Sequence, residues 1–258
     1  MTALLDHLES LRSSGRKLLV PYLMGGFPQA DAYPAALEAV AEQADAVEIG
    51  LPYSDPLMDG PMIASAGERV IRAGIGPLEA LELTGAVETQ PPRIVMTYYN
   101  PIHRLGEAEF CRRAVKAGMS GLIVPDLPLE ESASLRAAAA EEGLAWVSLI
   151  APTSSPDRVA AAAEVTTGFV YAISTLGVTG TRERLAETAA GVVEACRSAT
   201  GLPVLVGIGV STPEHARIAA GVADGVVIGS AVIRILGERG APSVAEFLSE
   251  VRAALDSL

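Results

Sequence analysis

Three consecutive segments near the C-terminus decide the fold: PVLVG over residues 203–207, STPEHARIAA over residues 211–220 and GVVIG over residues 225–229. The first and third are short runs of β-branched and small apolar residues, which is typical of buried strands. The middle segment is rich in alanine and begins Ser211-Thr212-Pro213-Glu214, a hydroxyl cap followed by proline in the first helical turn. This order of segments predicts two parallel strands joined by a helical crossover.

The same unit recurs along the chain of 258 residues. Eight units in this length predict an α/β fold, a (β/α)₈ (TIM) barrel, better than an open sheet. We find no linker or low-complexity segment and expect a single domain over residues 1–258, with an extra N-terminal amphipathic helix, Leu4–Leu11, that closes the barrel floor. The predicted strands are Leu18–Met24, Ala46–Ile49, Arg93–Tyr98, Gly121–Val124, Ala145–Ile150, Phe169–Ile173, Pro203–Gly207 and Gly225–Ile228. The predicted helices are Tyr33–Gln43, Pro77–Thr89, Glu107–Ala117, Glu130–Glu142, Pro156–Glu164, Leu185–Ala199, Thr212–Ala220, Ala231–Leu236 and Ser243–Leu258.

Composition argues against several classes of function. The chain has 19 Lys and Arg against 31 Asp and Glu, a net charge of −12, so we expect no binding of nucleic acid or of an anionic membrane surface. It has no uncharged apolar stretch of the roughly 20 residues that a membrane helix needs. Its N-terminus has no signal-peptide core, which predicts a soluble cytoplasmic protein. The two cysteines, Cys111 and Cys196, are expected to be free thiols.

Two carboxylates lie at the end of the second predicted strand and in the loop that follows it, at the end of the barrel where such folds carry their chemistry. Side chains alternate along a strand, so Val47 and Ile49 should face the helices and Glu48 should face the barrel mouth. A buried strand-end carboxylate suits acid–base work, although a glutamate bonded to a loop amide is the structural alternative. Asp59 lies in the loop that follows, in an Asp-Gly pair that would equally suit an ordinary turn.

Glycine-rich loops follow the last three predicted strands. They are Gly177–Gly180, Gly207–Val210 and the pair Gly229-Ser230, which opens a short helix. Backbone N–H groups of such loops, together with a helix N-terminus, bind phosphate without needing a lysine or an arginine. We therefore predict a phosphate site at this side of the barrel mouth.

The lack of suitable lysines and histidines at the barrel mouth limits the types of reaction further. Lys17 lies at the wrong end of the first strand and Lys116 lies on a helix, so neither is placed to form a Schiff base. His7, His103 and His215 are scattered and have no zinc-binding spacing. We expect no metal and no cofactor, and a phosphorylated small substrate handled by carboxylates.

The stretch Val47–Pro61, with its Glu48, Asp55 and Asp59, resembles the signature of the tryptophan synthase alpha chain family. Tyr171, the sixth loop and the glycines of the last two loops match that family as well, and the resemblance covers nearly the whole chain. It implies a cofactor-independent lyase that cleaves indole-3-glycerol phosphate to indole and glyceraldehyde 3-phosphate.

The resemblance also implies roles for single residues. Glu48 would protonate C3 of the indole ring and remove the proton of the glycerol hydroxyl, and Asp59 would take or polarise the indole N–H proton. Thr179 in the sixth loop would bond Asp59 when the site closes. The implied substrate-binding residues are Tyr22, Ile63, Tyr98, Leu127, Tyr171 and Thr179, although ordinary barrel core is the alternative for the apolar ones; the implied phosphate-binding residues are Gly180, Gly209, Gly229 and Ser230.

The family resemblance further implies a partner, a tryptophan synthase beta chain in an alpha2-beta2 complex, contacted through Pro52, Asp55 and neighbouring loops. Phe27 and Tyr99 depart from the usual pattern and bear on partner contacts or loop dynamics. Two alternatives stay open at this point. One is a stand-alone lyase that releases free indole for secondary metabolism, and the other is an idle subunit that only activates a beta chain.

Overall fold

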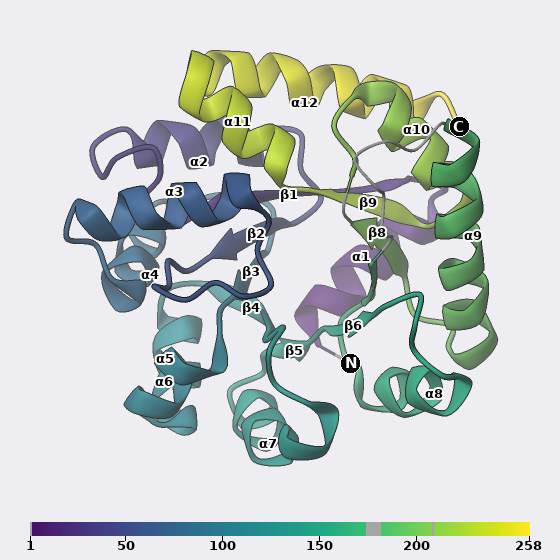
Figure 1. The fold of residues 1–258 in the computed structure, drawn as a ribbon, viewed down its shortest axis with the longest axis horizontal. Helices are drawn as coiled ribbons and strands as arrows, with labels where there is room; N and C mark the ends of the chain where they lie inside the picture. The colour runs from purple at the N-terminus through teal and green to yellow at the C-terminus, as the bar shows by residue number, and fades with distance from the viewer. Residues whose placement is uncertain (1, 174–181, 208) are drawn as a thin grey trace.

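The computed structural model describes residues 2–173, 182–207 and 209–258. Within them, nine parallel strands form one sheet in the order β5-β4-β3-β2-β1-β9-β8-β7-β6. The sheet curls into a nearly closed barrel that is surrounded by helices (Figure 1). The strands are β1 (Leu18–Met24), β2 (Val47–Gly50), β3 (Arg93–Met96), β4 (Met119–Ile123), β5 (Ala145–Trp146), β6 (Ser148–Ile150), β7 (Val170–Ile173), β8 (Val204–Gly207) and β9 (Gly225–Ile228).

Nine strands occupy eight positions around the barrel. β5 and β6 belong to the predicted run Ala145–Ile150 and are separated by Val147 alone. The first half of the run pairs with β4 and the second half with β7. The prediction of a (β/α)₈ barrel is therefore confirmed, with one predicted strand divided where its hydrogen-bonding neighbour changes.

Inward-facing side chains of alternate strand positions fill the barrel. Val20, Ala46, Ile94 and Val227 belong to one inner cluster of buried residues, whereas Val47 and Ile49 belong to the outer cluster between strands and helices. The inner cluster also contains Leu4 and Leu8 of helix α1 (Ala3–Ser13), so this helix closes the barrel floor as predicted.

The outer layer contains two helices that the sequence pattern did not indicate. α3 (Pro61–Arg72) begins directly after the Asp-Gly turn, and α5 (Tyr99–Leu105) begins where the strand run was expected to end. The other outer helices are α2 (Tyr33–Ala41), α4 (Pro77–Gly85), α6 (Glu107–Lys116), α7 (Ala133–Glu141), α8 (Pro156–Val165), α9 (Arg182–Ala199), α10 (Pro213–Val222), α11 (Ser230–Arg239) and α12 (Ala241–Asp256), and a single 3₁₀ turn, η1, spans Leu129–Glu131. Among the described helices, none is long and apolar enough to cross a membrane.

A buried ion pair joins the last helix to the barrel floor. Arg252 of α12 donates to the Asp45 carboxylate at 3.1 Å and to the Lys17 carbonyl at 2.8 Å. Asp45 also accepts from Arg16 and from the Leu19 amide. Because both Arg252 and Asp45 are buried, this pair fixes the end of α12 against the entrances of β1 and β2.

Candidate active site

A cavity of about 340 Å³ opens at the carboxyl ends of the strands, which is the size of a small-molecule site. Its wall combines two carboxylates, two tyrosines, several apolar side chains and three glycines. The lining residues are Tyr22, Glu48, Met58, Asp59, Gly60, Ile63, Met96, Pro125, Leu149, Tyr171, Ile173, Gly209, Val210, Ser211, Val227, Gly229 and Ser230.

Glu48 lies in the middle of β2 and faces the cavity, as the alternation of side chains predicted. It is only 2% exposed, and its Oε2 atom has no hydrogen-bond partner among the residues that the structure describes. Burial, and to a smaller degree the nearby Asp59 carboxylate, raise the pKa of Glu48 to about 8. At neutral pH this side chain is therefore a carboxylic acid with a proton to give.

Asp59 lies in the loop between β2 and α3. Burial raises its pKa to about 6, and a hydrogen bond from the Tyr98 side chain opposes that rise. The Tyr98 hydroxyl also accepts the Met58 amide at 2.9 Å. Near neutral pH, Asp59 is mostly ionised beside a protonated Glu48, so the cavity holds one proton donor and one proton acceptor.

Each cavity tyrosine lies directly over a glycine of the neighbouring strand. Tyr22 of β1 covers Gly50 at the end of β2, and Tyr171 of β7 covers Gly207 at the end of β8. A β-carbon on either glycine would overlap the tyrosine ring. Burial raises the pKa of each tyrosine well above its usual value, so both keep their hydroxyl protons. Asp59 and then Glu48 add to the rise for Tyr22, and Glu48 adds to it for Tyr171.

The opposite side of the cavity presents polar backbone and hydroxyl groups. α11 begins at Ser230 with Gly229 as its N-cap, and both residues line the cavity together with Gly209 and Ser211. The first amides of any α-helix lack partners within the helix and carry a partial positive charge. This end of the cavity is therefore suited to an anion. The expected phosphate residue Gly180 and the expected Asp59 partner Thr179 lie outside the described residues.

Two predicted substrate-binding residues lie away from the cavity wall. Leu127 packs against the outer hydrophobic cluster, and Tyr98 contacts Asp59 and Met58 from outside the lining. Ile63 of α3 does line the cavity. The strand-end residues that were not predicted include Met96, Leu149 and Ile173, each two positions beyond an inward-facing residue, so the alternation rule could have found them.

The loop after β2 presents a second kind of surface. Leu57 is 88% exposed and Met58 is 58% exposed, which is unusual for large apolar side chains. They flank the stretch that holds Pro52, which is buried, and Asp55, which is exposed. Exposed apolar side chains beside the cavity are typical of a protein-contact surface.

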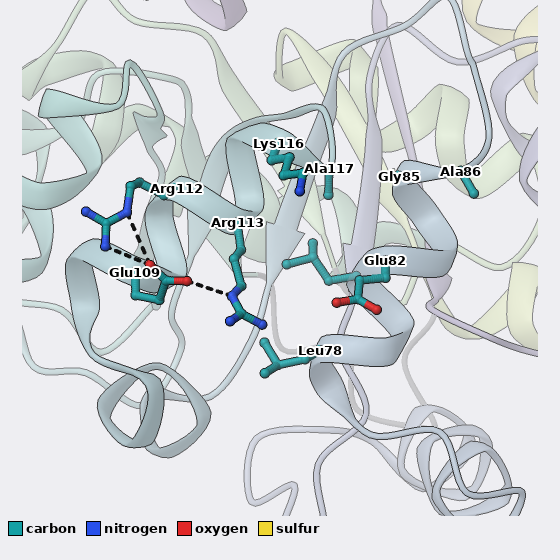
Figure 2. Close-up of a pocket in the computed structure, with 10 residues that line it drawn as sticks. Leu78, Glu82, Gly85, Ala86, Glu109, Arg112, Arg113, Lys116 and Ala117 are labelled. Carbon is teal, nitrogen blue, oxygen red and sulfur yellow. Dashed lines mark hydrogen bonds and ion pairs between the residues drawn. The ribbon is translucent and has the colours of Figure 1, made fainter.

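A larger hollow of about 710 Å³ lies outside the barrel between α4 and α6 (Figure 2). Arg112 and Arg113 both turn toward Glu109 there and pair with it. These side chains are well exposed, and the hollow lacks a buried polar atom without a partner. The central cavity, which holds the orphaned Glu48 oxygen, is the stronger candidate for chemistry. The described residues contain no group of three or more His, Cys, Asp or Glu placed to hold a metal ion.

The barrel and the carboxylates at its mouth define a (β/α)₈-barrel enzyme. The family model described as tryptophan synthase alpha chain matches residues 8–255. The tryptophan synthase alpha chain of Synechococcus elongatus is 44% identical over 260 residues, covering 99% of this chain and 98% of the relative. A structure of Mycobacterium tuberculosis tryptophan synthase superposes with a TM-score of 0.91 at 39% identity, covering 98% of each chain. The alpha subunit from Legionella pneumophila superposes with a TM-score of 0.90 at 30% identity over the whole of both chains. The chain belongs to the tryptophan synthase alpha chain family, whose members are lyases.

Proposed function

We propose that this protein cleaves indole-3-glycerol phosphate to indole and glyceraldehyde 3-phosphate as the alpha subunit of a tryptophan synthase. The observation that carries the proposal is Glu48, a buried carboxyl group whose Oε2 atom has no partner in the described part of the chain, in a cavity that it shares with Asp59. Family membership supplies the substrate, and the cavity supplies groups that match the chemistry.

The reaction needs a proton added to C3 of the indole ring and a proton removed from the glycerol hydroxyl, so that the C–C bond between them breaks. Glu48, protonated near neutral pH, donates to C3, and its carboxylate then accepts the hydroxyl proton. Asp59, ionised in the same range, accepts the indole N–H proton while the ring is protonated at C3, and returns it to the ring nitrogen as the C–C bond breaks. The two carboxyl groups hold different protonation states because Glu48 is more deeply buried. Each such transfer is typically worth about 10²–10⁴-fold in rate.

The remaining walls match the two ends of the substrate. Ile63, Met96 and Leu149 line the same cavity as Glu48 and Asp59 and offer apolar surface to the indole ring. The start of α11, with Gly229 and Ser230, would hold the phosphate together with Gly209. Gly180 and Thr179 complete this assignment on the basis of the family resemblance. No metal or organic cofactor enters the proposed steps.

The partner in this proposal is a tryptophan synthase beta chain in an alpha2-beta2 complex. The contact surface would include Pro52 and Asp55, with Asn100 of the neighbouring loop. The exposure of Leu57 and Met58 supports it, because a partner would cover this apolar surface. That exposure favours a subunit over a stand-alone lyase.

The direct test is incubation of the purified protein with indole-3-glycerol phosphate, measuring both indole and glyceraldehyde 3-phosphate. The same assay is repeated with a tryptophan synthase beta chain added. Formation of both products in equal amounts, with a higher rate in the presence of the beta chain, is the expected result. Product formation that the beta chain leaves unchanged would instead indicate a stand-alone lyase. Activation of a beta chain by a chain that makes no product would indicate an idle subunit.

A further inference from the structure

Two tyrosines from adjacent loops form a stack beside the cavity. Tyr53 follows β2 and Tyr98 follows β3, and their ring centroids lie 5.1 Å apart with an angle of 27° between the planes. The Tyr53 hydroxyl accepts a hydrogen bond of 3.0 Å from the Asn100 side-chain amide. Tyr98 is 4% exposed, so the Tyr53 ring is part of what covers it.

Tyr98 in turn holds two consecutive residues of the loop between β2 and α3. Its hydroxyl oxygen accepts the Met58 amide at 2.9 Å, and the same hydroxyl lies close enough to the Asp59 carboxylate to lower the pKa of that group. Asp59 lies outside regular secondary structure, so no ladder of strand or helix hydrogen bonds fixes its side chain. Its own amide bonds only locally, to the Pro56 carbonyl at 3.2 Å. Among the described residues, the Tyr98 hydroxyl therefore holds this part of the loop from outside it, through the amide of the residue next to Asp59.

We infer that Tyr53 is a positioning residue for the reaction: its ring orients Tyr98, and through Tyr98 it aims the Asp59 carboxylate into the cavity. This inference rests on the proposed function for the part of it that concerns rate. Tyr53 itself is absent from the cavity lining, so it acts through its neighbour and does not touch substrate. The hydroxyl group of a tyrosine has one proton to donate, and the plane of the ring sets the direction of that O–H bond. A stacked aromatic neighbour fixes the ring plane more firmly than apolar packing alone.

The stack carries a consequence for protonation as well as for geometry. The described titratable groups that interact with Asp59 are Glu48, Tyr22 and Tyr98. Of these, Tyr98 is the one that lowers the Asp59 pKa. Loosening Tyr98 weakens that hydrogen bond, so the pKa of Asp59 rises and the acidic limb of the pH–rate profile moves to higher pH.

The test compares Tyr53→Leu, which removes the ring, with Tyr53→Phe, which keeps the ring and removes only the hydroxyl. Tyr99→Leu is the matched control, since Tyr99 lies on the same short helix as Asn100 and its ring contacts His103 instead, at a tilt of 37°. We expect Tyr53→Leu to lower kcat about threefold to tenfold with little change in KM, from the usual strength of an aromatic pair. Tyr53→Phe and Tyr99→Leu should stay within about twofold of the parent protein. Equal losses in Tyr53→Leu and Tyr99→Leu would overturn the inference.

A double-mutant comparison with Tyr98→Phe separates action through Tyr98 from general damage. If Tyr53 acts through the Tyr98 hydroxyl, Tyr53→Leu has almost no further effect once that hydroxyl is gone. Additive losses would contradict this. The Asp59 pKa is also measured by carboxyl NMR in the protein without substrate, where Tyr53→Leu should raise it and Tyr53→Phe should not. This readout needs no turnover, so it judges the positioning role even if the protein fails to cleave indole-3-glycerol phosphate. An unchanged Asp59 pKa in Tyr53→Leu would rule the role out.

Discussion

The ring of Tyr22 lies over Gly50 so closely that position 50 accepts no side chain. A β-carbon added at Gly229 would lie 3.5 Å from the β-carbon of Tyr22, so the glycine that caps α11 also lies close to this tyrosine. The glycine at the end of β2 is therefore what allows a tyrosine from β1 to stand beside Glu48. The absence of a side chain at Gly50 therefore decides where the Tyr22 ring lies in the cavity.

Gly50→Ala should consequently damage both stability and activity. The added methyl group forces Tyr22 out of its place, which overpacks the mouth at a cost of about 1–3 kcal/mol in the free energy of unfolding. Gly191→Ala is the control, because Gly191 lies on α9 with nothing within 4 Å of its added β-carbon, and alanine should stabilise the helix slightly. Chemical denaturation and steady-state kinetics of both variants provide the measurement. A Gly50→Ala variant as stable and active as the parent would show that Tyr22 has room to move.

The pH dependence of kcat/KM should be bell-shaped. It should rise as Asp59 ionises, with its pKa at about 6, and fall as Glu48 loses its proton, with its pKa at about 8.

Glu48→Gln and Asp59→Asn should each lower the rate by more than about 10² while leaving circular dichroism unchanged. Near-normal turnover in either variant would remove that residue from the mechanism.

Glu48→Gln should also change how stability depends on pH. Burial raises the pKa of the folded carboxyl from about 4.5 to about 8, so between these values the folded state holds a proton that the unfolded state has lost. The parent protein therefore loses stability as pH rises through this window, and the glutamine variant lacks that loss. We expect equal stability of the two near pH 4 and a variant that is more stable by over about 1 kcal/mol near pH 8. Urea unfolding at both pH values decides this, and a difference that does not grow with pH would contradict the assignment.

The anion end of the cavity is tested at Gly229. Gly229→Asp places a carboxylate beside the start of α11 and should raise KM for the phosphorylated substrate at least about tenfold. Gly229→Asn has nearly the same shape without the charge, so it should raise KM much less. Sulfate should compete with substrate in the parent protein and much more weakly in Gly229→Asp. Equal KM values for the two variants would indicate that the size of the added side chain, and not its charge, weakens substrate binding at this end of the cavity.

Breaking the buried ion pair at the barrel floor should affect stability alone. Arg252→Leu leaves the buried Asp45 with Arg16 as its remaining cationic partner and should cost about 3 kcal/mol. Arg112→Leu is a matched control on the surface, where loss of the exposed pair with Glu109 should change the free energy of unfolding much less. Kinetic constants of the folded Arg252→Leu protein should match those of the parent, because the pair lies at the far end of the barrel. A large fall in kcat would show that the floor is coupled to the mouth.

Much of this protein follows from short-range patterns. The alternation of apolar strand runs with helical segments predicted the barrel. The alternation of side chains along the second strand predicted the inward direction of Glu48, because that alternation is a property of the extended backbone itself. Amphipathic spacing predicted the helix under the barrel, and glycines around Gly209 and Gly229 indicated an anion site. The helices α3 and α5 were missed because each begins where a turn or a strand signal stood, and local signals of that kind are outweighed by packing against the barrel.

Other features were decided only by the tertiary structure. The predicted strand Ala145–Ile150 is divided at Val147 because its first half pairs with β4 and its second half with β7. A local sequence pattern does not show this change of partner. Leu127 turned toward the outer cluster and Tyr98 toward Asp59, because a loop side chain has no period and its direction depends on neighbours brought from elsewhere in the chain. The pKa of Glu48 likewise depends on how much water the closed barrel removes from it. The sequence by itself determined which residue types stand at the barrel mouth, and the tertiary structure decided which of them meet, because contact and desolvation are properties of the assembled barrel.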